Sequence, residues 1–100
     1  MIRADVIELI GDRPIAHGVY DAHGESRRTV FAEIKSVGMK EAYEAMSHGL
    51  HPSIVFVLQL SDEYENEHEI IYHGERYKVV RAYMVGDGIE LTAERVTDDV

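Results

Sequence analysis

The sequence predicts a mainly β fold, a small antiparallel β-barrel or sandwich of about six strands with one short α-helix at about residues 38–48. Three observations support this fold class. Short segments rich in β-branched and aromatic residues alternate with glycine-containing turns. One segment changes its apolar period from two residues to a helical repeat. Tight hairpin signals, together with a single helix, favour an antiparallel sheet over βαβ units.

The first expected strand covers Ala4–Ile10, where Val6 and Ile7 are β-branched and favour extended backbone. Gly11 and the turn-forming residues that follow it interrupt this pattern. Residues 11–27 are therefore expected to form a long loop. A loop of this length in a compact domain is usually functional or disordered.

The second strand and the helix follow one another directly. Thr29–Lys35 alternates in polarity, with Val30 and Ala32 on one face, as in a strand whose other face is mainly polar. The next apolar residues follow helical spacing: Met39, Ala42, Tyr43, Met46 and Leu50. Gly38 can cap the start of this helix, and Gly49 can follow its end. Because so short a helix is marginal alone, we expect its apolar face to pack against the core.

The remaining strands are expected at Ser53–Leu60, Glu69–His73, Arg76–Val85 and Glu90–Val96. Ser53–Leu60 is apolar on both faces, which is typical of a central strand or an interface. Gly74 and Gly86 mark two tight hairpins. The acidic run from Asp62 to Glu69 is interpreted as a solvated loop, or as a negative rim for a basic partner, and the tail at 97–100 as frayed.

Composition limits the function classes. One hundred residues predict a single domain over 1–100, with a modest core. The formal charge of −9 argues against tight binding to nucleic acid, because such binding normally uses a basic face. The absence of cysteine excludes disulfides and thiolate metal sites. No long apolar run occurs, so we expect neither a signal peptide nor a membrane-spanning helix, and no membrane partner.

No complete catalytic or metal-binding motif is found. His68 and His73 are five residues apart, whereas a zinc-protease helix places its two histidines four apart. His48 and His51 lack an evident third ligand. The acidic run lacks the spacing of a calcium loop, and no serine lies in a nucleophile-elbow motif. We therefore expect no catalytic residue, no bound metal and no cofactor, and a protein that is not an enzyme.

Three tyrosines on neighbouring expected strands leave an alternative open. Tyr72, Tyr77 and Tyr83 could stack on the bases of a single strand, as in a small oligonucleotide-binding β-barrel. That use requires basic surroundings, and the net charge opposes it. Cross-strand aromatic packing is the other interpretation. A small barrel enzyme or ligand carrier would require a pocket with convergent polar groups, and the sequence indicates none.

Four segments, Arg28–Ala45, Gly49–Leu58, Ile71–Tyr83 and Gly88–Arg95, carry a family resemblance in their order of strands, short helix and tight hairpins. Over about residues 4–96, the chain resembles the head-closure (head–tail joining, or head–tail adaptor) proteins of long-tailed double-stranded DNA phages. The nearest similar class is a tail-side neck protein.

This resemblance implies a structural subunit of the phage head–tail connector, or neck. Such a ring closes the DNA-filled head below the portal and its adaptor and joins it to the tail. The implied partners are other copies of the chain, portal or adaptor proteins and tail proteins, with DNA passing nearby without tight binding. The implied location is the virion neck after assembly and the host bacterial cytoplasm before it.

The resemblance also implies two candidate contact segments. The connection between the second and third core strands can extend toward the channel in this family, and here it contains the expected helix. The candidate subunit-contact or channel-facing residues in this connection are Met39, Lys40, Tyr43, Glu44, His48 and His51. The candidate neighbour-contact residues in the 11–27 loop are Arg13, His17, Tyr20, His23 and Arg27.

Overall fold

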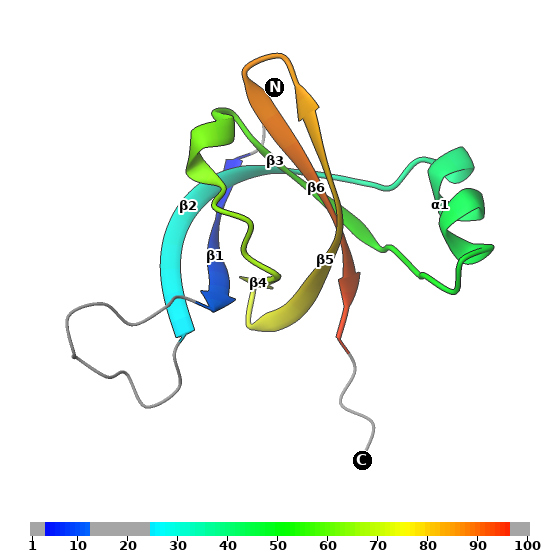
Figure 1. Ribbon diagram of the computed structural model, residues 1–100, viewed down its shortest axis with the longest axis horizontal. Helices are drawn as coiled ribbons and strands as arrows, with labels where there is room; N and C mark the ends of the chain where they lie inside the picture. The colour runs from blue at the N-terminus through cyan, green and yellow to red at the C-terminus, as the bar shows by residue number, and fades with distance from the viewer. Residues whose placement is uncertain (1–3, 13–24, 97–100) are drawn as a thin grey trace.

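The computed structural model describes residues 4–12 and 25–96, which form a closed antiparallel β-barrel with one α-helix (Figure 1). The elements are β1 (Ala4–Asp12), β2 (Glu25–Lys35), α1 (Met39–Met46), β3 (Ile54–Leu58), the short 3-10 helix η1 (Ser61–Glu63), β4 (Glu69–Tyr72), β5 (Glu75–Val85) and β6 (Gly88–Arg95). The strand order around the barrel is β1-β2-β3-β6-β5-β4, closed by pairing of β4 with β1. The predicted fold class is confirmed. The expected tail at 97–100 lies outside the described residues.

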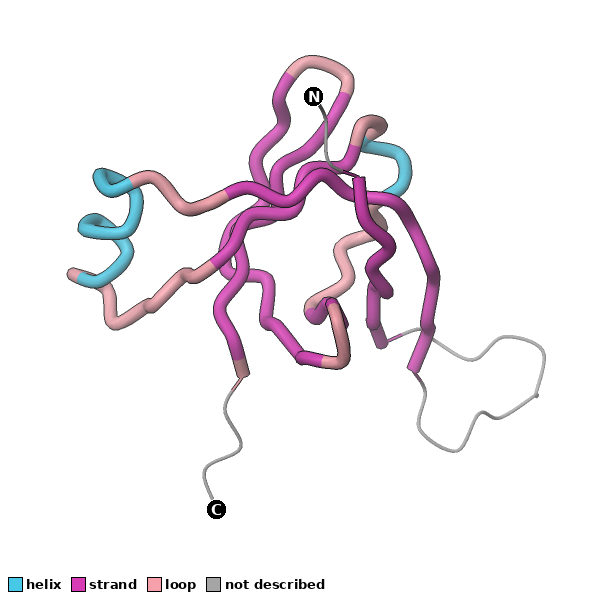
Figure 2. Tube along the Cα trace, turned by 180° about the vertical axis from the view of Figure 1, so that it is seen from behind, coloured by secondary structure: helices cyan, strands magenta, loops and turns pink. Residues whose placement is uncertain are grey.

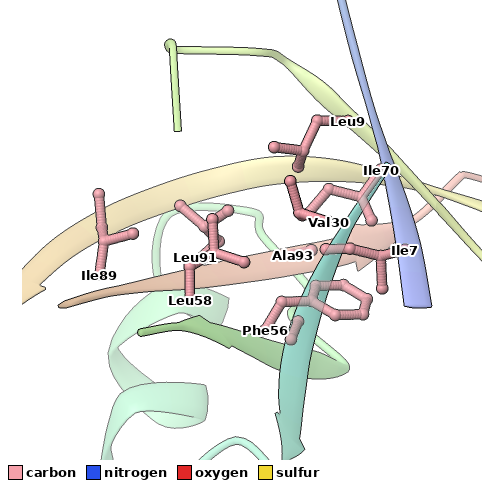
Figure 3. Packing of buried hydrophobic residues seen from close by; sticks show 10 residues of the cluster. Ile7, Leu9, Val30, Phe56, Leu58, Ile70, Ile89, Leu91 and Ala93 are labelled. Atoms are coloured by element: carbon pink, nitrogen blue, oxygen red, sulfur yellow. The ribbon is translucent and has the colours of Figure 1, made fainter. Parts of the chain in front are cut away.

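The core is formed by the inward faces of the strands (Figure 3). Phe56 and Leu58 of β3 are fully buried in it. Val30 and Ala32 of β2 point inward while Phe31 between them points out, as the predicted alternation requires. The other members of the buried cluster are Ile7, Leu9, Ile70, Ile89, Leu91 and Ala93. Every strand contributes a side chain except β5, whose Tyr77 and Val79 pack partly buried against the cluster.

The first two strands are longer than predicted. Their ladder continues to the pair Asp12–Glu25, so Gly11 lies within a strand and does not end one. Gly11 is buried, and a Cβ atom there would lie 2.9 Å from Cγ of Glu67. Glycine is used at this position because another side chain approaches the backbone closely.

The hairpins confirm the turn signals. His73 and Gly74 both have positive φ, 51° and 77°, which is the pattern of a type I′ turn between β4 and β5. Gly86 has a φ of 59° in the turn between β5 and β6. These turns match the right-handed twist of the strands they join.

Strand β3 ends earlier than predicted. It stops at Leu58, and the side chain of Leu60 is 56% exposed where burial on the strand face was expected. Beyond the strand, the N–H of Ser61 donates to the carbonyl oxygen of Asp87 at 2.8 Å, in the turn between β5 and β6. The chain therefore leaves the ladder before Leu60 reaches the core.

None of the helices in residues 4–12 and 25–96 has the length and apolarity needed to cross a membrane. The single α-helix of these residues is eight residues long.

Candidate interaction surface

The helix lies on an arm that extends from the barrel. Strands β2 and β3 are hydrogen-bonded neighbours, with Lys35 opposite Val55, and antiparallel neighbours can be joined by a two-residue turn. Here residues 36–53 make the connection, and Figures 1 and 2 show α1 projecting to one side. The arm is therefore much longer than the connection of these two strands requires.

The apolar stripe of α1, formed by Met39, Tyr43 and Met46, faces away from the barrel. These side chains are 79%, 72% and 54% exposed, and no residue of α1 is buried. The prediction that this face packs in the core was therefore wrong for these three residues, whereas Ala42 and Leu50, which the predicted face also included, are partly buried. Large exposed apolar side chains that are contiguous on a soluble protein usually mark a binding surface.

The opposite face of α1 is turned toward the barrel. Glu41, Glu44, Ala45 and His48 line a cleft of about 230 Å³ whose other wall includes Arg81 of β5 and Thr92 of β6. At 3.6 residues per turn, this set lies across the helix axis from the apolar stripe. The helix has thus placed its polar side on its own domain and its apolar side in solvent.

Glu41 explains this orientation. One of its carboxylate oxygens accepts a hydrogen bond from the Thr92 hydroxyl at 3.1 Å and lies 3.4 Å from Nη1 of Arg81. Thr92 is only 5% exposed, so its hydroxyl needs this partner. A β-bulge between Val79 and Arg81 interrupts the β5–β6 register beside the cleft, and bulges commonly re-aim side chains. A further contact, from the His51 N–H to Glu94 Oε2 at 3.2 Å, holds the end of the arm.

A second apolar surface, the barrel groove, lies on the outer face of β2 and β3. Phe31, Val57 and Leu60 supply its apolar lining, and Glu33 and Glu63 supply carboxylates. Its volume is about 340 Å³, and Phe31 is 69% exposed. In Figures 1 and 2, η1, which directly follows Leu60, lies on the side of the barrel away from α1. The groove and the helical stripe are therefore separate surfaces.

A third exposed apolar cluster occupies the tip of the β5–β6 hairpin, which protrudes in Figure 1. Tyr83, Met84 and Val85 are each about half exposed there. The guanidinium carbon of Arg81 lies 5.3 Å from the centre of the Tyr83 ring, within the range of a cation–π contact.

The three tyrosines do not share a surface. Tyr72 and Tyr77 make edge-on contacts with buried Phe56, at ring-centre distances of 5.5 and 5.6 Å. For this pair, the interpretation as cross-strand packing is confirmed. Tyr83 lies apart on the exposed hairpin, so the three rings do not form one stacking platform.

Most basic side chains of the described residues are matched by acids. Every described arginine, and Lys35, has a carboxylate oxygen within 4 Å. Lys40 and Lys78 have no ion pair within residues 4–12 and 25–96. This pairing leaves no basic groove on the described surface of the kind that binds phosphates.

Sequence reasoning missed one buried carboxylate. Glu67 lies in the acidic run that was expected to be solvated, yet it is 3% exposed and paired with Arg28 of β2. The hydroxyl of Tyr64 donates to the Glu67 carbonyl oxygen at 2.8 Å. Burial, and then the nearby Glu67 charge, raise the pKa of Tyr64 above its ordinary value. Nothing in the local pattern of alternating acids distinguishes Glu67 from its neighbours.

The candidate contact residues divide into three groups. Met39, Lys40, Tyr43 and Glu44 lie on α1, and His48 and His51 follow it on the same arm, all exposed. Arg27 is in β2 and not in a loop, and its Nη1 lies 3.6 Å from Oε2 of Glu8. The rest of the predicted loop set lies outside the described residues: Arg13, His17, Tyr20 and His23.

Within the described part of the chain, no group of three or more His, Asp and Glu side chains is arranged to hold a metal ion. His73 is engaged elsewhere, with Nε2 at 2.8 Å from Oδ2 of Asp5 across the barrel surface. The three exposed surfaces described above, the stripe, the barrel groove and the hairpin tip, are instead formed mainly by apolar side chains.

The chain was also compared with known proteins. A scan against protein-family models gives no matching family, and a search of curated proteins gives no matching relative.

Proposed function

We propose that this protein is a structural subunit of a phage head–tail connector, in the ring that closes the DNA-filled head and joins it to the tail. The proposal rests on the resemblance in strand and hairpin order to head-closure proteins. The observation that carries it is the orientation of α1. A helix that turns its apolar stripe away from its own barrel presents the kind of surface that a neighbouring subunit covers in a ring.

The charge supports the same role. A ring that lets DNA pass should not hold phosphates, and the chain carries a net charge of −9. The arginines of the described surface are already paired with carboxylates. The protein is therefore expected to contact other proteins and to leave DNA free to move.

The direct test is genetic. In a phage that carries this gene, its deletion should leave filled or leaking heads and free tails that do not join, as seen by electron microscopy of lysates. Supplying the gene on a plasmid should restore joined particles. Normal virions in the deletion strain would contradict the proposal.

A small oligonucleotide-binding barrel is the second candidate, because the closed six-strand barrel is compatible with it and Arg81 lies over the exposed ring of Tyr83. Electrophoretic mobility shift at low salt discriminates the two, since phosphate-driven affinity is strongest there. The connector proposal predicts no shift with single-stranded DNA. A tight complex that Tyr83→Ala weakens would favour the oligonucleotide-binding barrel.

A further inference from the structure

We propose that two copies of this chain associate head to tail, with the Met39–Tyr43–Met46 stripe of one copy seated in the barrel groove of the next. This inference deepens the proposed function, on which it rests, by naming the two surfaces that meet. A second copy of the chain is the partner of both surfaces.

The shapes of the two surfaces are complementary. The stripe has the i, i+4, i+7 spacing of helices that bind with one apolar face in a groove. The barrel groove is hollow and lined by Phe31, Val57 and Leu60. The third apolar cluster lies on the protruding β5–β6 hairpin (Figure 1), and its residues Tyr83, Met84 and Val85 line neither the cleft under α1 nor the barrel groove.

The charges are also complementary. Lys40 flanks the stripe, is exposed, and has no ion pair with a described residue. The groove contains Glu33 and Glu63, whose carboxylates likewise have no ion pair within the described part of the chain. The acids of α1 do not oppose this contact, because Glu41 is held on the barrel side by Thr92 and Glu44 lines the same cleft. A lysine beside the helix and carboxylates beside the groove would set the orientation of the contact.

The arrangement in the fold makes the contact intermolecular. Figures 1 and 2 place α1 and η1 on different sides of the barrel, so the stripe does not fold back into its own groove. Two different patches that meet in this way form a heterologous interface, which repeats from copy to copy and closes into a ring where the rotation allows. Each copy in such an assembly uses both surfaces.

Cysteine cross-linking tests the contact directly, because the chain has no cysteine of its own. Ser47 directly follows Met46 and Ala4 lines the barrel groove, so cysteines at these two positions leave the stripe and the apolar lining of the groove intact. Ser47→Cys and Ala4→Cys, carrying different affinity tags, are mixed and treated with a short bis-maleimide. The expected product is a mixed dimer of the two variants, the stripe–groove dimer, in several-fold excess over either homodimer. Tyr83→Cys mixed with Ala4→Cys is the matched control, because Tyr83 is also well exposed but lies on the hairpin.

Two outcomes would overturn the proposal. One is a yield of the stripe–groove dimer no greater than that of the control mixture. The other is a dominant homodimer of the Ser47→Cys variant, which would show a two-fold contact between stripes. All three substitutions are at exposed positions, and circular dichroism should show each variant folded.

Charge reversal supplies an independent test. Lys40→Glu should weaken self-association about tenfold in sedimentation equilibrium, whereas Lys78→Glu, on the exposed face of β5, should not. Mixing the Lys40→Glu variant with a Glu33→Lys or Glu63→Lys variant should restore the association. Failure of both to restore association overturns the assigned pairing.

The cross-linking test addresses the interface and the genetic test addresses the connector role, so either claim can be rejected without the other. A specific stripe–groove dimer together with normal virions lacking the gene would retain this interface and reject the connector role. Unjoined heads and tails without that dimer would retain the role and reject this interface.

Discussion

The carboxylate of Glu67 and the guanidinium of Arg28 form an ion pair in which one oxygen, Oε2, lies 2.7 Å from Nη2 and 2.8 Å from Nε. Arg28 also donates to the carbonyl oxygen of Glu63, and the other oxygen of Glu67 accepts the N–H of Glu65 at 2.7 Å. The pair thus ties the segment from η1 to β4 onto β2. Because Glu63 and Leu60 belong to the barrel groove, this pair also stabilises one wall of it.

Glu67→Gln should lower the free energy of unfolding by about 2 kcal/mol, because Arg28 keeps its charge and loses its nearest carboxylate, while that of Glu65 lies 3.9 Å away. This is less than the ~3–5 kcal/mol for fully buried pairs, since Arg28 is 27% exposed. Urea denaturation measures the change. Glu90→Gln, which opens the more exposed pair with Lys35, is the control and should cost at most ~1 kcal/mol. Equal effects of the two variants would contradict the structural role of Glu67.

Gly11→Ala should destabilise the protein by about 1–3 kcal/mol, as overpacking of a fixed neighbour does. The added methyl would lie 2.9 Å from Cγ of Glu67, which Arg28 holds in place. Gly38→Ala is the matched control, because nothing lies within 4 Å of its Cβ position and its φ is −68°. Thermal melts should show a lower midpoint for Gly11→Ala than for Gly38→Ala. An unchanged midpoint for Gly11→Ala would mean that the Glu67 side chain can move away from the added methyl group.

Leu58→Asp should unfold the domain. Leu58 is fully buried in the core, and an unpaired buried carboxylate costs several kcal/mol. Glu65→Ala should stay within about 0.5 kcal/mol of the parent, because that side chain is 54% exposed. Circular dichroism during heating distinguishes them. A cooperative melt for Leu58→Asp near that of the parent would refute the burial of Leu58.

Tyr43→Ser should leave the stability of the monomer within about 0.5 kcal/mol of the parent, because the ring is 72% exposed. Dilute samples are needed, so that self-association does not contribute to the melt. A loss of several kcal/mol would instead indicate that the stripe packs on its own barrel. The same variant should reduce self-association at high concentration.

The carboxyl group of Asp5 should titrate below its ordinary pKa in an NMR pH series. The backbone N–H of Val6, which donates to Oδ1 at 2.8 Å, is the larger cause, and the His73 imidazole at 2.8 Å from Oδ2 is the next. Both favour the charged form. His73→Ala should therefore raise this pKa only part of the way back, and full restoration would assign the whole effect to His73.

The sign of the pH dependence follows from the direction of this shift. A carboxyl whose pKa is lowered by folding stabilises the folded state at pH values above its unfolded pKa. That contribution is lost as the pH falls through the lowered folded value. Asp5→Asn should therefore flatten the acid side of the stability profile slightly, which acid-unfolding curves would measure.

The barrel strands were predictable because their signals are local. The alternation of side chains along a strand places Val30 and Ala32 on the same, inward face, whichever strand pairs with β2. The tight turn between β4 and β5 needs a residue with positive φ, and Gly74 meets that need within the turn itself. The boundaries were less predictable. The sequence predicts that the first strand ends before Gly11. In the structure, Gly11 pairs with Ser26 of β2 and packs against Glu67, and β1 continues to Asp12.

The helical spacing of its residues is enough to give α1 one apolar and one polar face. It does not specify which face meets the barrel, because Met39, Tyr43 and Met46 fit burial in the same chain or in another equally well. Thr92 and Arg81, which are 51 and 40 residues from Glu41, select the polar face by hydrogen bonding its carboxylate to the barrel. Arg28, 39 residues from Glu67, likewise selects the one buried acid of its run. Both choices depend on groups that lie far apart along the chain and come within hydrogen-bonding distance only when the barrel closes.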